Sequence, residues 1–160
     1  MNTVFRVNSR QRLIVTGAAM KKLLSFAQHR TCQPEAGGVL LGRHLLESAN
    51  VVVDEVTTPQ KSDKRSRFGF FRSKRHGAIA RERWSAEAGT CAYLGLWHTH
   101  PEGDPVPSSA DRLDWYTAVA NDVFDGDRLF FLIVGTRNVR VWCVNRRGHC
   151  RALKESVRHD

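Results

Sequence analysis

The chain has 160 residues and a formal net charge of +9, with 41% apolar and 26% charged residues. These fractions are close to globular averages, and the length suits one domain, residues 1–160, with a substantial core. The first residues do not form a cationic segment followed by an apolar one, and no apolar run approaches the roughly 20 residues that span a bilayer, so we expect no membrane association and a cytoplasmic protein.

The hydrophobic pattern predicts an α+β chain. In chain order, we expect a strand near 13–15, a helix from the N-cap Thr16 to about residue 30, strands over 35–46 and 51–56, a helix over 76–88, a strand over 92–98, a helix over 111–121, and strands over 129–135 and 139–144. The last ten residues are predicted to be frayed. This order favours a curved, mostly antiparallel sheet flanked by helices.

The four cysteines do not form a recognisable framework. Cys32, Cys91, Cys143 and Cys150 lack the Cys-x2-Cys spacing of structural zinc sites. A two-residue turn within 145–148 would place Cys143 opposite Cys150, as a disulfide or as a pair of thiols. In a reducing cytoplasm, free thiols are the favoured interpretation.

Two histidines and an aspartate form the most informative motif, in the segment from His98 to Asp111. His98 and His100 are two residues apart at the end of a predicted strand, so their side chains point to the same side. Prolines and a glycine then turn the chain before Asp111, which opens a helix. Three protein ligands leave a fourth tetrahedral position for water, which is typical of a catalytic zinc site. Ser108-x-x-Asp111 also fits a helix capping box, although a cap explains neither histidine.

Glu35 is an acidic residue that enters an apolar strand rich in glycines. A carboxylate at the start of a buried strand is costly unless it has a partner or a role. The alternative is an edge residue exposed to water.

These residues resemble the JAB/MPN+ (JAMM) metalloproteases. The resemblance rests on Glu35 with the glycines of 38–42, followed by His98-x-His100-Pro-x6-Ser108-x2-Asp111, and it covers about residues 15–144. It implies a cytidine-deaminase-like fold and one Zn²⁺ per chain, held by His98, His100 and Asp111. It also implies that Glu35 is the general base for the water at the metal, and that Ser108 donates a hydrogen bond to the oxyanion.

A basic segment over 61–75 carries seven Lys or Arg residues against one acid, with Phe68, Phe70 and Phe71 interleaved. It could contact nucleic acid, bind an acidic protein partner, or form a solvated loop whose phenylalanines tuck under the sheet. The resemblance favours the protein partner, because an insertion here (about 58–75) helps to hold the modifier protein in this family. On that basis the substrate-binding candidates are Phe68, Phe70 and Arg72, with Gly37 and Gly38 beside a narrow groove.

The small size and the sequence of the loop are most similar to the stand-alone JAB isopeptidases of bacterial operons, including CBASS anti-phage operons. This resemblance implies hydrolysis of the bond after the C-terminus of a ubiquitin-like modifier, or of a protein conjugated in the same way. An E1/E2-like enzyme of the same operon is a further candidate partner. Two alternatives stay open, a non-catalytic binding module of the same fold and a basic nucleic-acid-binding domain, the latter being the less favoured.

Overall fold

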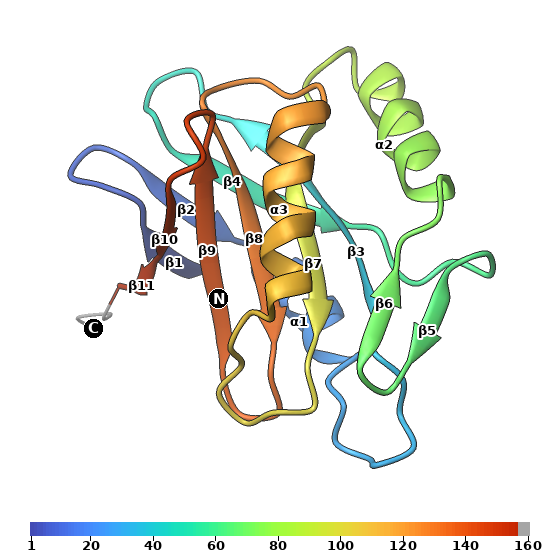
Figure 1. The fold of residues 1–160 in the computed structure, drawn as a ribbon. Helices are drawn as coiled ribbons and strands as arrows, with labels where there is room; N and C mark the ends of the chain where they lie inside the picture. Colours follow the sequence, from blue (N-terminus) through green and yellow to red (C-terminus); the bar gives the residue numbers. More distant parts are fainter. Residues whose placement is uncertain (157–160) are drawn as a thin grey trace.

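Nine strands form one strongly curved sheet in the computed structural model, which describes residues 1–156 (Figure 1). Its spatial order is β10-β9-β8-β7-β3-β4-β2-β1-β11, and only the pairs β2–β4 and β7–β8 are parallel. The bounds are β1 Thr3–Arg6, β2 Arg12–Val15, β3 Gly37–His44, β4 Val51–Val56, β7 Ala92–Thr99, β8 Arg128–Val134, β9 Val139–Asn145, β10 Cys150–Ala152 and β11 Lys154–Glu155. The predicted curved, mostly antiparallel α+β architecture is thereby confirmed.

Three helices and a hairpin complete the described part of the chain. Helix α1 is Gly17–Leu24, α2 is Arg75–Ala86 and α3 is Ser109–Asn121, while β5 (Lys64–Ser66) and β6 (Gly69–Phe71) pair only with each other. Helix α3 crosses one face of the sheet and α1 lies behind the other (Figure 1). Within residues 1–156, none of the helices has the length and apolar character to cross a membrane.

The two outermost strands follow each other directly in the chain. β10 pairs with β9 at one edge, and β11 pairs with β1 at the other, with only Leu153 between them. Leu153 is buried and donates its N–H to Val141 O at 2.9 Å. The sheet therefore curls until its edges approach each other, as in a barrel. The expectation of a frayed end was wrong for residues 151–155, because main-chain pairing orders a segment too short and polar to show a strand pattern. Residues 157–160 lie outside the described part.

Both faces of the sheet are buried under separate apolar clusters. Phe130 and Leu132 of β8 face the cluster that includes α1, whereas Phe131 and Ile133 face the cluster that includes α3. This two-sided burial explains the continuous apolar run of β8, since neither face meets water. The stacked rings of Trp115 and Phe131, with centroids 4.9 Å apart, fasten α3 to the sheet.

Helix α1 is shorter than predicted. Thr16 caps it as expected, accepting the Ala19 N–H at 3.2 Å. The helix ends at Leu24, where Ser25 Oγ donates to Lys22 O, rather than continuing to residue 30. The following residues make tight turns because the polar segment after Ala27 has no helical apolar stripe to bury.

Cys143 and Cys150 are not opposite each other, contrary to the predicted register. The loop contains three residues, 146–148: Gly148 has φ +84° and donates to Asn145 O, and Asn145 N–H donates to His149 O. Because the loop is one residue longer than predicted, Cys150 lies opposite Val144 and not opposite Cys143. All four cysteines are free thiols, as the preferred interpretation predicted.

Candidate metal centre and catalytic cleft

A bulge in β7 determines which side of the sheet the two histidines face. Leu94 packs in the α1 cluster, but Leu96 packs in the α3 cluster, although strict alternation would place both on one face. The irregularity lies at Gly95, whose φ is +150° and where a Cβ would meet Phe130 O at 1.7 Å. The bulge therefore turns every later even-numbered position of β7, including His98, toward α3.

His98, His100 and Asp111 bring their ligand atoms together, all within 4.8 Å of one another. The two Nε2 atoms lie 3.0 Å apart. Asp111 places Oδ1 3.2 Å from His98 Nε2 and Oδ2 3.1 Å from His100 Nε2. Strand β7 supplies His98, the residue that follows it supplies His100, helix α3 supplies the carboxylate, and both imidazoles are buried. Two imidazoles and a carboxylate at this spacing are a donor set that suits zinc.

The same Asp111 side chain also closes the cap of α3. Ser108 Oγ accepts the Asp111 N–H at 3.0 Å, and Asp111 Oδ2 accepts the Ser108 N–H at 2.8 Å. The capping box and the ligand set therefore coexist. The cap holds the carboxylate in position before any metal binds.

Glu35 lies two residues before β3, and its carboxylate reaches the same cluster. Its neighbour Ala36 is bound in both directions to Thr99, the residue between the histidines: Ala36 N–H donates to Thr99 Oγ1 at 2.9 Å, and Thr99 N–H donates to Ala36 O at 2.9 Å. This pairing sets Glu35 Oε1 3.8 Å from His100 Nε2, with the carboxyl buried. Sequence spacing alone could not provide this proximity.

The buried charges act on one another. Burial raises the pKa of Glu35 to about 7, partly opposed by His100 and assisted by the charges of Asp111 and Glu102. Burial lowers the pKa of His98, which favours the neutral imidazole that a metal requires. Burial alone would lower the pKa of His100, but its interactions with Asp111 and Glu102 outweigh burial, so the pKa is raised overall. Burial raises the pKa of Asp111, yet bonds from both histidines hold it well below its usual range.

The β5–β6 hairpin, residues 64–71, forms one wall of a cleft around this centre. Glu35 N–H donates to Ser66 O at 2.7 Å, and Arg65 Nε donates to Glu35 O at 2.7 Å, so the hairpin clamps the main chain of Glu35. The cleft, with a volume of about 540 Å³, contains the predicted metal ligands, Glu35 and Ser108, together with Phe68, Phe70 and Arg72 of the predicted substrate-binding set.

Gly37 lies against Phe70 of the hairpin and Gly38 lies against Thr57, and neither is among the residues that line the cleft. A Cβ on Gly37 would come within 2.6 Å of the Phe70 ring, and one on Gly38 within 2.2 Å of Thr57 O. These glycines therefore let the hairpin and β4 pack closely on β3. Their proposed role beside a narrow substrate groove stays a prediction.

A comparison with protein families identifies the family of this chain. A family model described as prokaryotic homologs of the JAB domain matches residues 18–146, which include Glu35 and the whole segment from His98 to Asp111. The chain belongs to this JAB family. The match agrees with the resemblance predicted for residues 15–144.

Two relatives of this JAB domain share the same name. A "CD-NTase/cGAS isopeptidase" of Vibrio cholerae is 34% identical over 136 residues, covering 84% of this chain and 83% of the relative. A protein of the same name from Pseudomonas aeruginosa is 43% identical over 97 residues, covering 58% of this chain and 60% of that protein. The solution structure of protein DSY2949 from Desulfitobacterium hafniense has a TM-score of 0.60 at 22% identity, covering 89% and 88% of the two chains, which shows the shared fold.

The hairpin of this JAB domain is anchored by a buried polar chain that sequence reasoning missed. Asp63 Oδ2 accepts from His76 Nε2 at 2.8 Å, and His76 Nδ1 lies 2.6 Å from Thr57 Oγ1, which accepts the Val39 N–H at 2.8 Å. Asp63 also accepts the N–H groups on both sides of the hairpin, from Gln60 and Ser73. No sequence signal links positions 57, 63 and 76, because they come from three different elements.

The basic segment is thus an ordered hairpin rather than a solvated loop. Only Phe70 tucks inward, against Gly37 and edge-on to His76. Phe68 and Phe71 are 77% and 71% exposed. Phe68 and Phe71 are therefore two large, solvent-exposed aromatic rings at the edge of the cleft, and such exposed apolar groups are suited to contact with a protein partner.

Proposed function

We propose that this JAB domain is a zinc-dependent isopeptidase that releases a ubiquitin-like modifier, or a protein conjugated through its C-terminus, from its target. The observation that carries the proposal is the meeting of a buried carboxyl of raised pKa, Glu35, with the His98, His100 and Asp111 cluster in one cleft. A buried acid–base group beside a metal donor set is the combination that metal-dependent amide hydrolysis uses.

His98, His100 and Asp111 would hold the metal. A zinc ion bound there supplies a Lewis acid for the scissile carbonyl and lowers the pKa of water to about 7. Asp111 approaches with its capped carboxylate, which cannot swing away without breaking its bond to the Ser108 N–H. The protein therefore presents the ligands in a nearly assembled arrangement.

Glu35 would act as the general base and then as the general acid. Its carboxylate takes a proton from the attacking water and delivers it to the departing amine. In the metal-free protein burial raises the pKa of Glu35 to about 7. A buried carboxyl that exchanges its proton readily suits both halves of this cycle. The clamp from Ser66 and Arg65 on its main chain limits its movement between the two steps.

Ser108 would stabilise the oxyanion. Its Oγ already accepts the Asp111 N–H, which leaves the hydroxyl hydrogen available for donation into the cleft. A donor aimed at developing negative charge contributes about 10²–10³ in rate.

The substrate would enter as an extended C-terminal tail that pairs main chain to main chain with a neighbouring strand. Phe68, Phe70 and Arg72 line the cleft from the hairpin side and are the contacts proposed for the tail. The names of the relatives support a CD-NTase/cGAS-type protein as the conjugated partner. We further propose, from the family resemblance of the sequence alone, that an E1/E2-like enzyme of the same anti-phage operon makes the bond that this protein hydrolyses.

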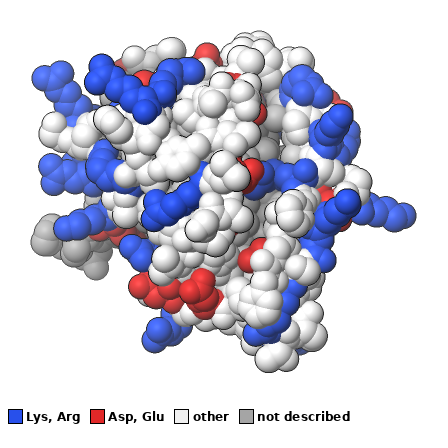
Figure 2. Space-filling view, viewed as in Figure 1, with Lys and Arg blue, Asp and Glu red and all other residues white. Residues whose placement is uncertain are grey.

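Two other functions are less well supported. A non-catalytic binding module would not need Glu35 beside a complete ligand set. A nucleic-acid-binding domain would need a concentrated basic surface, whereas Figure 2 shows Lys and Arg distributed mainly around the rim of the visible face. The basic hairpin also adjoins the carboxylates of Glu35, Glu102 and Asp111, which would repel phosphate.

The test uses a CD-NTase/cGAS-type protein whose C-terminal carboxylate is joined to a lysine side chain of a peptide. The wild type is expected to release the peptide, to lose activity to a chelator and to recover it with Zn²⁺. Glu35→Gln should retain zinc but not hydrolyse the conjugate, and Asp111→Ala should lose both. Hydrolysis by Glu35→Gln, or full activity without metal, would contradict the proposed mechanism.

A further inference from the structure

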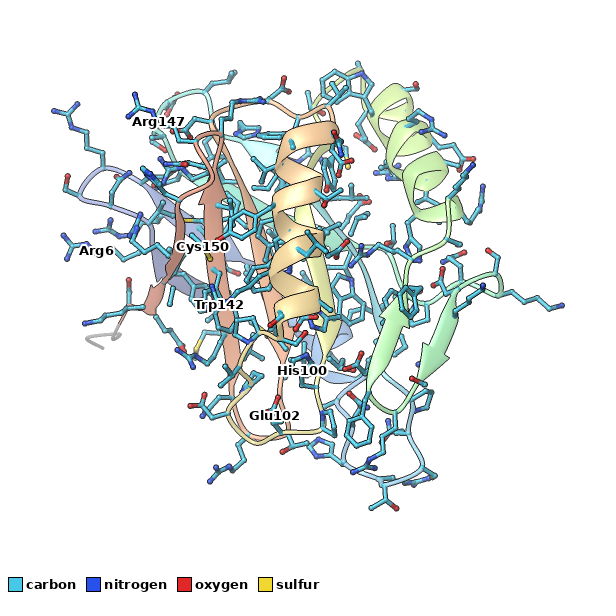
Figure 3. All side chains as sticks on the ribbon, in the orientation of Figure 1. Arg6, His100, Glu102, Trp142, Arg147 and Cys150 are labelled. Atoms are coloured by element: carbon cyan, nitrogen blue, oxygen red, sulfur yellow. The ribbon has the colours of Figure 1, made fainter. Side chains whose placement is uncertain are left out.

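His100 is bound at both ring nitrogens. Its Nε2 faces Asp111 and His98, while its Nδ1 lies 2.8 Å from Glu102 Oε1. Figure 3 labels His100 and Glu102 near the lower end of α3, at the start of the loop that leads from β7 to that helix. Glu102 falls at one of the unspecified positions between Pro101 and Ser108 in the motif that predicts the metal ligands.

The main chain of Glu102 is fixed independently of its side chain. Thr136 N–H donates to Glu102 O at 2.7 Å, and the N–H groups of Arg137 and Asn138 donate to Gly103 O at 3.1 and 3.0 Å. These bonds tie the loop to the β8–β9 turn, and a Cβ on Gly103 would come within 2.5 Å of Arg137 Nε. The carboxylate therefore extends from a held segment of main chain toward His100.

We propose that Glu102 is a positioning residue of the metal centre, which orients His100 so that Nε2 is the ligand atom. An imidazole can bind a metal through either nitrogen, and the hydrogen bond at the other nitrogen decides which one is free. A carboxylate that accepts the Nδ1–H holds the ring plane and makes Nε2 a stronger donor. This inference rests on the proposed zinc site.

Glu102 has a second conceivable use, because its side chain lines the cleft and is half exposed. As a substrate contact, it would affect the KM of the reaction and leave metal affinity unchanged. As a positioning residue, it would affect metal affinity without any substrate present. Zinc affinity therefore separates the two roles.

The experiment measures the Zn²⁺ affinity of the purified full chain by competition with a chromophoric chelator. Glu102→Ala is expected to bind zinc about 10–100-fold more weakly than the wild type. Glu102→Gln should fall between them, because its amide oxygen still accepts the Nδ1–H but carries no charge. The matched control is Asp104→Ala, which removes an acid from the same loop that contacts Asn138 and Arg140 rather than a histidine.

Each outcome has a defined meaning. Unchanged affinity in Glu102→Ala, with or without a raised KM, overturns the inference and leaves the proposed function intact. An equal loss in Asp104→Ala also overturns it, since the effect would then come from the charge of the loop. A wild type that binds no zinc overturns the proposed function together with the inference. Matching thermal unfolding of the metal-free variants excludes misfolding as the cause of a weaker affinity.

Discussion

Ser108 and Asp111 exchange two hydrogen bonds across the start of α3, and the Asp111 oxygen that accepts from Ser108 N–H also lies 3.1 Å from His100 Nε2. One carboxylate therefore completes a helix cap and belongs to the cluster of His98, His100 and Asp111 that could hold a metal ion. The Ser108-x-x-Asp111 pattern fits both a helix cap and a metal ligand. Here each supports the other, because the cap removes the freedom that the ligand would lose on binding metal.

Ser108→Ala is expected to lower kcat by about 10²–10³ and to destabilise the protein by about 0.5–2 kcal/mol, since it removes both the oxyanion donor and the cap. Ser108→Gly is the matched control, because glycine is nearly as good a cap and has no hydroxyl. Its stability should stay near that of the wild type while its kcat falls equally. Full activity in Ser108→Gly would exclude the oxyanion role. Steady-state kinetics and urea unfolding provide the two measurements.

Zinc at 100 times its Kd should raise the free energy of unfolding of the wild type by about 2.7 kcal/mol. Asp111→Asn can still accept the Ser108 N–H but lacks the charge of the ligand, so we expect little stabilisation by zinc. Thermal unfolding with and without Zn²⁺ measures this difference. Equal stabilisation of both proteins would place the metal elsewhere.

The metal-free protein should lose stability as pH rises through the titration of Glu35. Its pKa is raised from 4.5 to about 7, so the folded state binds more protons than the unfolded state between these values. The free energy of unfolding therefore decreases from about pH 4.5 to about pH 7 and levels off above it, by about 3 kcal/mol at most. Glu35→Gln should lack this decrease and be the more stable protein at neutral pH. Parallel pH profiles from urea unfolding would show that Glu35 titrates normally.

Asp63→Ala is expected to release the β5–β6 hairpin, since it leaves His76 and two N–H groups without their acceptor. Breaking such a buried pair costs about 3–5 kcal/mol. Limited proteolysis should show faster cleavage within 61–75, and kcat/KM should fall while zinc affinity is maintained. Lys61→Ala, a change at an exposed position in the same segment, is the control. Loss of zinc affinity in Asp63→Ala would mean that the damage extends beyond the hairpin.

Local patterns predicted most of the central elements and the three side chains, His98, His100 and Asp111, that the structure brings together. His98 and His100 share a face because they are two apart in the extended chain at the end of β7, and Asp111 lies in the first turn of α3. The inner strands could be predicted because their buried residues form apolar runs in the sequence. Strands β10 and β11 could not be predicted in this way. They form only by pairing with β9 and β1, and the sequence of the segment itself does not reveal this pairing.

The sequence by itself determined the identity and spacing of the chemical groups: two imidazoles, a carboxylate and an acid at the start of a strand. Only the tertiary structure decided that Glu35 comes within 3.8 Å of His100, because the β3–β7 register and the Ala36–Thr99 bonds join segments more than sixty residues apart. It also decided that the histidines face α3, through a bulge at Gly95. Proximity between distant segments depends on register and packing, and these are properties of the assembled sheet rather than of any local pattern.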